Sequence, residues 1–138
     1  MKNRFILLCS HGRFCEEILE SAKMIGVSTE NVFCFPLMPG VDPEDYSKNI
    51  ESFLISHNTG EFIFITDVFG GTPCMTLINL SQKYDFNLLA GLNLPMLLTI
   101  TEGNGTSIDN LLSETISAGK DGVRDISKEL RESNIWQK

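Results

Sequence analysis

One histidine and one aspartate each follow an apolar run of the chain, and the two together could perform nucleophilic chemistry. His11 follows the run 5–9, and Asp67 follows the run 62–65. A carboxylate that accepts a hydrogen bond from one ring nitrogen fixes the tautomer of an imidazole and leaves the other nitrogen free as a nucleophile. The carboxylate also stabilises the positive charge that develops on the ring. This pair suits attack on phosphorus, with a phosphohistidine as the product.

The residues after Asp67 predict a site that binds the phosphoryl group. Gly70 and Gly71 can adopt backbone angles that other residues rarely reach. Thr72 is a favoured N-cap residue, and Pro73 suits the first position of a helix. A helix that begins here would direct free N–H groups at the space beside Asp67, where an anion is favoured. These donors can carry the phosphoryl charge, so we expect no metal ion and no cofactor.

None of these residues is diagnostic when it is taken alone. A single histidine after a strand is more often a loop residue, and Asp67 or the two glycines could simply form a turn. Their joint placement at two strand ends favours a function. By contrast, His57 lies near the end of an amphipathic helix, where a cation is stabilising, and we interpret it as structural. A hydrolase is disfavoured because no nucleophile is well placed, with Ser10 as the one alternative left open.

Short apolar runs alternate with amphipathic helices along the chain. This alternation predicts an α/β fold with a doubly wound, mostly parallel four-stranded sheet, helices on both faces and the flavodoxin-like strand order 2-1-3-4. Ligands of such sheets bind beyond the carboxyl ends of the strands, where the strand order reverses. Adjacent first and third strands would bring His11 to Asp67. The expected strands are 5–9, 32–35, 62–65 and 86–90, and the expected helices are 14–25, 43–57, 73–83, 93–101 and 108–119.

The composition predicts a single globular domain over residues 1–138. Apolar residues make up 42% of the chain and charged residues 21%. The net charge of −7 argues against nucleic acid or an anionic membrane as the main partner. The longest apolar region, 88–100, is too short and too interrupted to span a bilayer, and no signal peptide is visible. We therefore expect a soluble, cytoplasmic protein whose four cysteines are buried thiols.

Four motifs occur in order along the chain, and together they are specific. They are Ser10-His11-Gly12, Thr66-Asp67 with Gly70-Gly71-Thr72-Pro73, Ala90-Gly91-Leu92-Asn93-Leu94-Pro95-Met96-Leu97, and Ala118-Gly119-Lys120-Asp121-Gly122. In this order and spacing they resemble the mannose-type IIA proteins of the bacterial phosphoenolpyruvate-dependent sugar phosphotransferase system. The resemblance covers roughly residues 3 to 126.

The resemblance implies a reaction and its partners. His11 would accept a phosphoryl group on Nε2, Asp67 would hold Nδ1, and Thr72 would lie near the phosphoryl group. The donor would be the phosphorylated carrier protein HPr and the acceptor a IIB protein or domain, so that membrane contact arises only through the transporter complex. The family commonly forms homodimers that exchange a C-terminal strand, which would be residues 122–126 here. We expect a free-standing IIA protein.

Two local features add to this prediction. Cys74-Met75 stands where many family members have Phe-Asn, which removes a polar side chain from the first turn of the helix and affects partner contacts there. Arg13 follows the His-Gly pair at a position that varies in the family. We hypothesise that Arg13 helps to hold the phosphoryl group or an acidic partner, and that Ser10 contributes to the same site.

Two alternatives remain at this stage. The first is the phosphocarrier subunit of a phosphoenolpyruvate-dependent dihydroxyacetone kinase, whose IIA-like part shares this fold and whose partner is a kinase subunit. The second is a flavodoxin-like module that binds a small anion without being phosphorylated. A response-regulator receiver is disfavoured because no acidic pair follows the first strand, and the sequence contains neither GxxxxGK[ST] nor GxSxG.

Overall fold

A four-stranded parallel sheet forms the centre of the molecule. The structure is a computed structural model, and it describes residues 3–103 and 105–133. The strands are β1 (Arg4–His11), β2 (Val32–Leu37), β3 (Glu61–Thr66) and β4 (Asn87–Ala90). They lie in the order β2-β1-β3-β4, and every neighbouring pair is parallel. The predicted fold class and strand order are thus confirmed.

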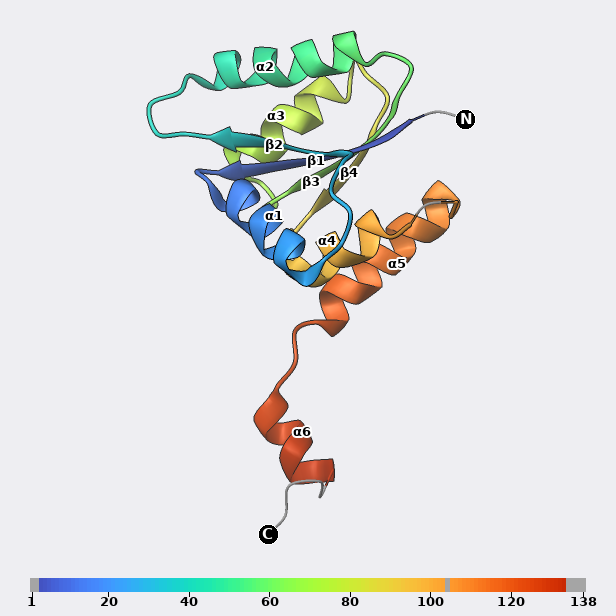
Figure 1. Cartoon of the computed structure of the whole chain (residues 1–138). Coiled ribbons are helices and arrows are strands. Elements are labelled where there is room, and N and C mark those ends of the chain that lie inside the picture. The colour runs from blue at the N-terminus through green and yellow to red at the C-terminus, as the bar shows by residue number, and fades with distance from the viewer. Residues whose placement is uncertain (1–2, 104, 134–138) are drawn as a thin grey trace.

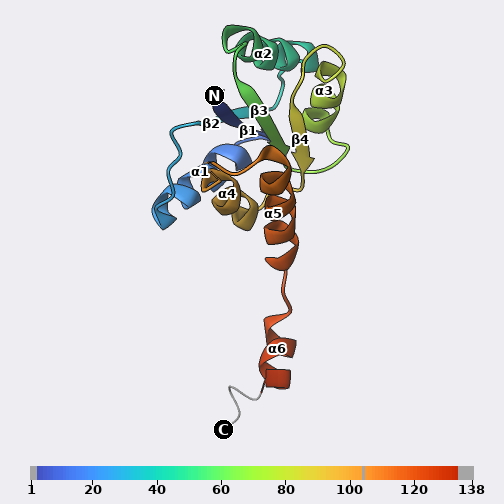
Figure 2. The same cartoon turned by 90° about the vertical axis from the view of Figure 1, so that its right-hand side faces the viewer.

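Helices cover both faces of the sheet. They are α1 (Phe14–Ile25), α2 (Pro43–Ser56), α3 (Thr72–Leu80), α4 (Leu94–Thr101), α5 (Ile108–Asp121) and α6 (Ile126–Ser133). Figures 1 and 2 show α2 and α3 on one side of the sheet and α1, α4 and α5 on the other. The local signals behave as expected: Asp42 accepts a hydrogen bond from the N–H of Glu44 to cap α2, and Gly26 ends α1 at a φ of 104°.

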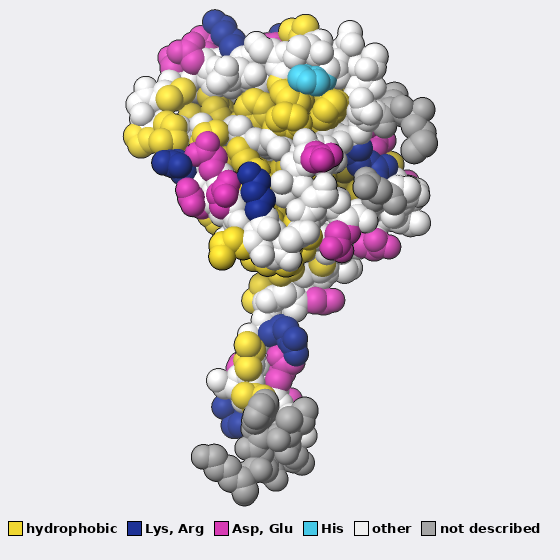
Figure 3. Space-filling view, in the orientation of Figure 1, with side chains coloured by type: hydrophobic (Ala, Val, Ile, Leu, Met, Phe, Trp, Pro, Cys, Tyr) yellow, Lys and Arg dark blue, Asp and Glu magenta, His cyan; other side chains and the backbone are white. Residues whose placement is uncertain are grey.

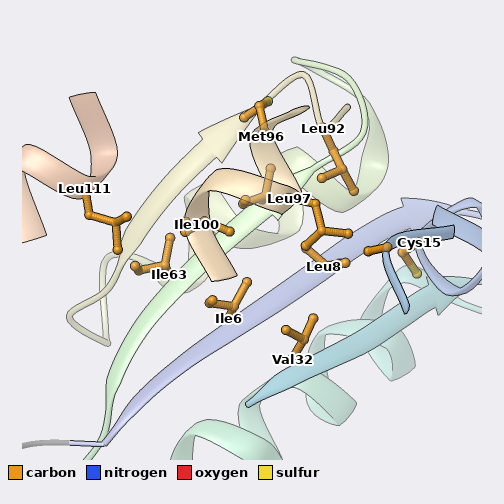
Figure 4. Close-up of a cluster of buried hydrophobic side chains, with 12 residues drawn as sticks. Ile6, Leu8, Cys15, Val32, Ile63, Leu92, Met96, Leu97, Ile100 and Leu111 are labelled. Carbon is orange, nitrogen blue, oxygen red and sulfur yellow. The ribbon is translucent and has the colours of Figure 1, made fainter. Parts of the chain in front are cut away.

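Two apolar cores result from the alternation of side chains along the strands. Ile6 and Leu8 of β1 point to one face and Leu7 and Cys9 to the other, and β3 follows the same rule. Figure 4 shows the first core, in which side chains of β1 and β3 meet those of α4 and α5. The sheet is therefore buried on both faces, and its central strands read as continuous apolar runs.

The register of the central strands brings two strand ends together. Cys9 of β1 pairs with Thr66 of β3, and the N–H of Asp67 donates a hydrogen bond of 3.1 Å to the carbonyl oxygen of Cys9. β1 continues two residues beyond the predicted strand, so His11 is its last residue and does not lie in the following turn. This register fixes the backbone of His11 relative to that of Asp67.

Other element boundaries differ from the prediction by one to three residues. β2 continues through Pro36. Pro has no N–H to donate to a neighbouring strand, and this is tolerated because β2 is an edge strand. Gly71, in an extended conformation, is the N-cap of α3, so the helix begins at Thr72 and the prediction that Thr72 is the cap was wrong. α3 also ends at Leu80, three residues earlier than expected, and a turn follows it.

The C-terminal segment lies apart from the body. No strand forms at 122–126: residues 122–125 connect α5 to α6, and Ile126 begins α6. Figures 1 and 2 both show α6 extending away from the sheet, and none of its residues is buried. An exchanged strand needs a second chain as its partner, so the exchange stays a prediction.

The four cysteines are free thiols, and Cys9, Cys15 and Cys74 are buried while Cys34 is half-buried. Burial raises the pKa of the Cys9 thiol, since the thiolate would be poorly solvated.

No helix of residues 3–103 and 105–133 is long and apolar enough to cross a membrane.

Candidate active site

A tight turn at the end of β1 presents His11 to solvent. Gly12 adopts a φ of 56°, which favours glycine, and its N–H donates to the carbonyl oxygen of Leu37 at 2.8 Å. The Ser10 hydroxyl donates to the carbonyl oxygen of Gly12 and accepts from the N–H of Cys15, each at 2.9 Å. Ser10 thus holds the turn against the first turn of α1, whose N-cap residue, Arg13, makes no side-chain cap.

This arrangement changes the role expected of Ser10. The residue is fully buried: alternation along β1 places Ser10 on the same face as Leu8, against the first turn of α1, and places His11 on the opposite face, where the strand ends and the side chain is exposed. Its hydroxyl is engaged as donor and as acceptor. The structure therefore does not bring Ser10 to the phosphoryl site as predicted, and neither does it offer Ser10 as an exposed nucleophile.

The carboxylate of Asp67 holds both the backbone and the ring of His11. Asp67 Oδ2 lies 2.8 Å from the backbone nitrogen of His11 and 2.8 Å from its Nδ1. Asp67 Oδ1 accepts a third hydrogen bond, from the N–H of Val68, at 2.8 Å. Two backbone donors thus fix the carboxylate independently of its contact with the ring. The predicted pairing of His11 with Asp67 is present in the structure.

These contacts keep Asp67 ionised and set the tautomer of His11. Partial burial of the carboxylate opposes ionisation, but hydrogen bonds from His11 and Val68 outweigh it and hold the pKa of Asp67 below its ordinary value. An ionised carboxylate only accepts hydrogen bonds, so Nδ1 of His11 must carry a proton. In the neutral ring the lone pair then resides on Nε2.

The free side of the ring faces the start of α3. The His11 side chain is 51% exposed, whereas that of Asp67 is 13% exposed. The ring lies against Gly71: a Cβ built on Gly71 would be 2.6 Å from Cε1 of His11 and 3.2 Å from Nε2. No side chain of the described residues caps α3, so the N–H groups of its first turn are open to an anionic ligand.

The remaining predicted site residues differ in how close they come to His11. Gly70, at a φ of 87°, and Gly71 form the turn that leads from Asp67 into α3. Thr72 is half-buried at the first position of that helix. Arg13 is exposed and turned along α1, where its guanidinium pairs with Glu16 at 3.1 Å and with Glu17 at 3.5 Å. In this structure Arg13 is therefore committed to its own helix.

Sequence reasoning missed an apolar collar around the site. We use this name for six exposed hydrophobic residues that follow the ends of β1, β2 and β3: Phe14, Met38, Val41, Val68, Phe69 and Met75. Phe69 is the most exposed of them, at 83%. Figure 3 shows hydrophobic side chains at the end of the body at which β1 and β2 terminate, and a larger group of them farther along the same face, beside the histidine in view. The available signal was the Val68-Phe69 pair, two apolar residues inside a glycine-containing turn.

The fold and this site define a class of α/β proteins that carry a histidine at the switch point of a parallel sheet. A sequence model of the family described as "PTS system fructose IIA component" matches residues 5–115. The chain belongs to this family, of the mannose class.

Particular relatives agree with this assignment. The chain is 27% identical over 123 residues to the mannose-specific EIIAB component of Escherichia coli K12. The match covers 86% of this chain but only 38% of that protein, so this chain spans well under half of its length. It is 26% identical over 107 residues to the sorbose-specific EIIA component of Klebsiella pneumoniae, or 76% of this chain and 78% of that one. A crystal structure of EIIA from Streptococcus agalactiae superimposes with a TM-score of 0.83 at 28% identity, over 91% of this chain and 98% of that chain.

Proposed function

We propose that this protein is a phosphocarrier that takes a phosphoryl group from phospho-HPr onto His11 and passes it to a IIB protein or domain. The observation that carries the proposal is the hydrogen bond of 2.8 Å between Asp67 and Nδ1 of His11, which leaves Nε2 with its lone pair on a ring that is half exposed. In this proposal residues 1–138 form one IIA domain of the mannose type.

The transfer conserves atoms and charge without a cofactor. The lone pair of Nε2 attacks phosphorus, and the bond between phosphorus and the donor's imidazole breaks with its electrons remaining on that imidazole. The proton on Nδ1 of His11 stays in place, hydrogen-bonded to Asp67, whose negative charge stabilises the ring as it becomes cationic. The N–H groups at the start of α3 bind the phosphoryl oxygens, with Gly70, Gly71 and Thr72 lining that end of the helix. Transfer to the acceptor is the reverse sequence.

The apolar collar supports the view that the donor and acceptor are proteins. A site for a small anion needs only donors and an accessible pocket, whereas six exposed apolar residues around it suit a surface that is covered by a partner. The relatives that the chain matches are named as components of sugar phosphotransferase systems. These names favour a IIB acceptor over the kinase subunit of a dihydroxyacetone kinase.

The test is intact mass spectrometry after incubation with phosphoenolpyruvate, enzyme I and HPr. We expect the wild-type protein to gain one acid-labile phosphoryl group and the His11→Ala variant to gain none. The His57→Ala variant is the matched control and should be labelled like the wild type, because His57 lies outside the site. A wild type that stays unlabelled, while a known IIA protein is labelled in parallel, would leave anion binding as the better account.

The acceptor is identified by a second step. Purified phosphoprotein is mixed with a mannose-class IIB domain and, separately, with the kinase subunits of a dihydroxyacetone kinase. Rapid loss of the label to the IIB domain is the expected result. Loss to the kinase alone would overturn the proposed acceptor but retain His11 as the carrier.

The homodimer implied by the family is a further part of the proposal. Val123 and Ile126 are among the most exposed apolar residues of the segment after α5, and a second copy would give them a partner. Light scattering on the purified protein measures the mass directly. We expect a dimer, and we expect the double variant Val123→Asp/Ile126→Asp to shift it to a monomer.

A further inference from the structure

The contact between the His11 ring and Gly71 assigns a role to this glycine that its backbone does not require. Gly71 has a φ of −74° and a ψ of 171°, an extended conformation that any residue adopts. Its neighbour Gly70 is different, since a φ of 87° favours glycine for conformational reasons. What Gly71 provides is therefore the space that a side chain would otherwise fill.

The missing side chain of Gly71 leaves room for the imidazole. A Cβ at this position would lie 2.6 Å from Cε1 of His11 and 3.2 Å from Cγ2 of Val68. A contact of 2.6 Å is shorter than van der Waals contact between carbons, so the ring would have to move. It cannot move freely, because Nδ1, the ring atom next to Cε1, is held by the hydrogen bond of 2.8 Å to Asp67.

We propose that Gly71 is a positioning residue. Because it has no side chain, the His11 ring can pack directly against it, and this packing places Nε2 at the amino end of α3. Asp67 fixes one edge of the ring, and Gly71 fixes its distance from the helix that binds the phosphoryl oxygens. This inference rests on the proposed function for its catalytic meaning. The orientation of the ring can be measured without any phosphoryl transfer.

The variant that tests the proposal is Gly71→Ala. Its backbone conformation suits alanine, so we expect the fold to be retained, and the shortest contacts of the added methyl group are with the His11 ring, followed by the exposed side chain of Val68. We expect the ring to be displaced, the hydrogen bond to Asp67 to be lost, and phosphoryl transfer from phospho-HPr to slow about 100-fold, the typical effect of a displacement near 1 Å at a reacting group.

A matched control exists at the opposite edge of the sheet. A Cβ on Gly60 would lie 2.5 Å from Cε2 of Phe5, so Gly60→Ala also forces a methyl group against an aromatic ring. Phe5 in turn contacts the ring of His57, with ring centres 5.0 Å apart. The Gly60→Ala variant should therefore disturb the surroundings of His57 and leave His11 in place.

Long-range ¹H–¹⁵N NMR of histidine-labelled protein reads both rings, because the chain has only two histidines. At about pH 8, where an ordinary histidine is neutral, wild-type His11 should show a protonated Nδ1 and an unprotonated Nε2. Gly71→Ala should average the two tautomers of His11 and leave the His57 signals unchanged. Gly60→Ala should do the opposite. Retention of the wild-type His11 pattern and transfer rate in Gly71→Ala would overturn the proposal.

A double-mutant cycle provides a readout that is independent of the chemistry. If the methyl group of Gly71→Ala is disfavoured mainly by the His11 ring, its effect on the denaturation midpoint should be much smaller in a His11→Ala background, where only the contact with Val68 remains. An equal effect in both backgrounds would contradict a role in positioning that ring.

If the wild type accepts no phosphoryl group at all, the phosphocarrier proposal fails, while the NMR pattern and the cycle still decide whether Gly71 positions the ring.

Discussion

The two histidines of this chain occupy opposite kinds of environment. His11 ends a central strand, is half exposed, and donates a hydrogen bond from Nδ1 to a carboxylate. His57 is the C-cap of α2, where its Nδ1 lies 2.9 Å from the carbonyl oxygen of Phe53. The ring of His57 stacks on Phe53 with centres 4.0 Å apart and packs edge-on to Phe5.

The comparison shows that the partner of the ring decides what a histidine can do. Both rings have Nδ1 engaged, so both have the same nitrogen left over. A carbonyl oxygen carries no full charge and cannot stabilise a cationic ring as a carboxylate does. His57 also sits in an aromatic cluster, whereas Nε2 of His11 faces the uncapped start of a helix. The first environment stabilises a fold, and the second favours transfer of an anionic group.

The largest expected effect sharpens this difference by altering the partner of His11. Asp67→Asn keeps the shape of the side chain but cannot serve three donors, because one side of its amide is itself a donor. Its neutral amide also removes the charge that stabilises the ring. We expect phosphoryl transfer from phospho-HPr to fall by about 100-fold or more, as when an orienting aspartate is replaced in a catalytic triad. Stopped-flow or quench-flow kinetics measures the rate.

Asp85→Asn is the matched control for that experiment, because Asp85 is exposed and precedes β4 by two residues, at the amino end of that strand and away from the carboxyl ends where His11 lies. It should transfer at the wild-type rate. Equal rates for Asp67→Asn and wild type would contradict the comparison, since the charge of the hydrogen-bond partner would then not account for the difference between the two histidines.

The next effect concerns His57 and stability. Replacing the ring with Ala removes a stacked aromatic contact and a hydrogen bond, and we expect the free energy of unfolding to fall by about 1–2 kcal/mol. Urea denaturation followed by circular dichroism measures this change. The same variant should accept a phosphoryl group at the wild-type rate. A loss of transfer with an unchanged unfolding curve would show that the structural assignment of His57 is wrong.

A pH series tests the charge on Asp67 in the absence of any partner. Its pKa is lowered in the folded protein, so its contribution to stability is complete above the ordinary carboxyl pKa and is lost as the pH falls through the folded value. Asparagine does not titrate. The difference in unfolding free energy between wild type and Asp67→Asn should therefore be largest near pH 7 and shrink toward about pH 3. A difference that is independent of pH would indicate that the carboxylate is not held ionised.

The sequence predicted the strand order and the meeting of His11 with Asp67, because both follow from strong signals. Buried central strands are unbroken apolar runs, and the carboxyl ends of adjacent parallel strands lie at one edge of a sheet. The opposite orientations of Ser10 and His11 were also within reach. Once β1 is extended to His11, alternation along the strand places the two side chains on opposite faces of the sheet, although their different exposure depends on the helices that cover each face.

Other features depend on contacts that no local pattern encodes. Gly71 reads as a turn former in sequence, and only the built distance to the His11 ring reveals that it supplies space. The helix α6 has eight residues, none of them buried, and so short a helix has only a weak signal of its own. The exposure of Phe69 likewise follows from where the turn projects, which depends on the whole sheet.

The smallest expected effect concerns Arg13, the cation nearest to His11 in the sequence. Its guanidinium is exposed and pairs with Glu16 and Glu17, and exposed pairs of this kind contribute little. To contact a phosphoryl group or an acidic partner, the side chain must leave these two carboxylates. We expect Arg13→Ala to slow transfer only about two- to threefold, with most of the change in the association step and a weaker dependence on salt. Transfer at the wild-type rate at low ionic strength would remove Arg13 from the site and leave its helical pairs as its role. A loss as large as that of Asp67→Asn would instead mean that Arg13 turns toward His11 during transfer, so that the environment of His11 includes a cation that the resting structure keeps on α1.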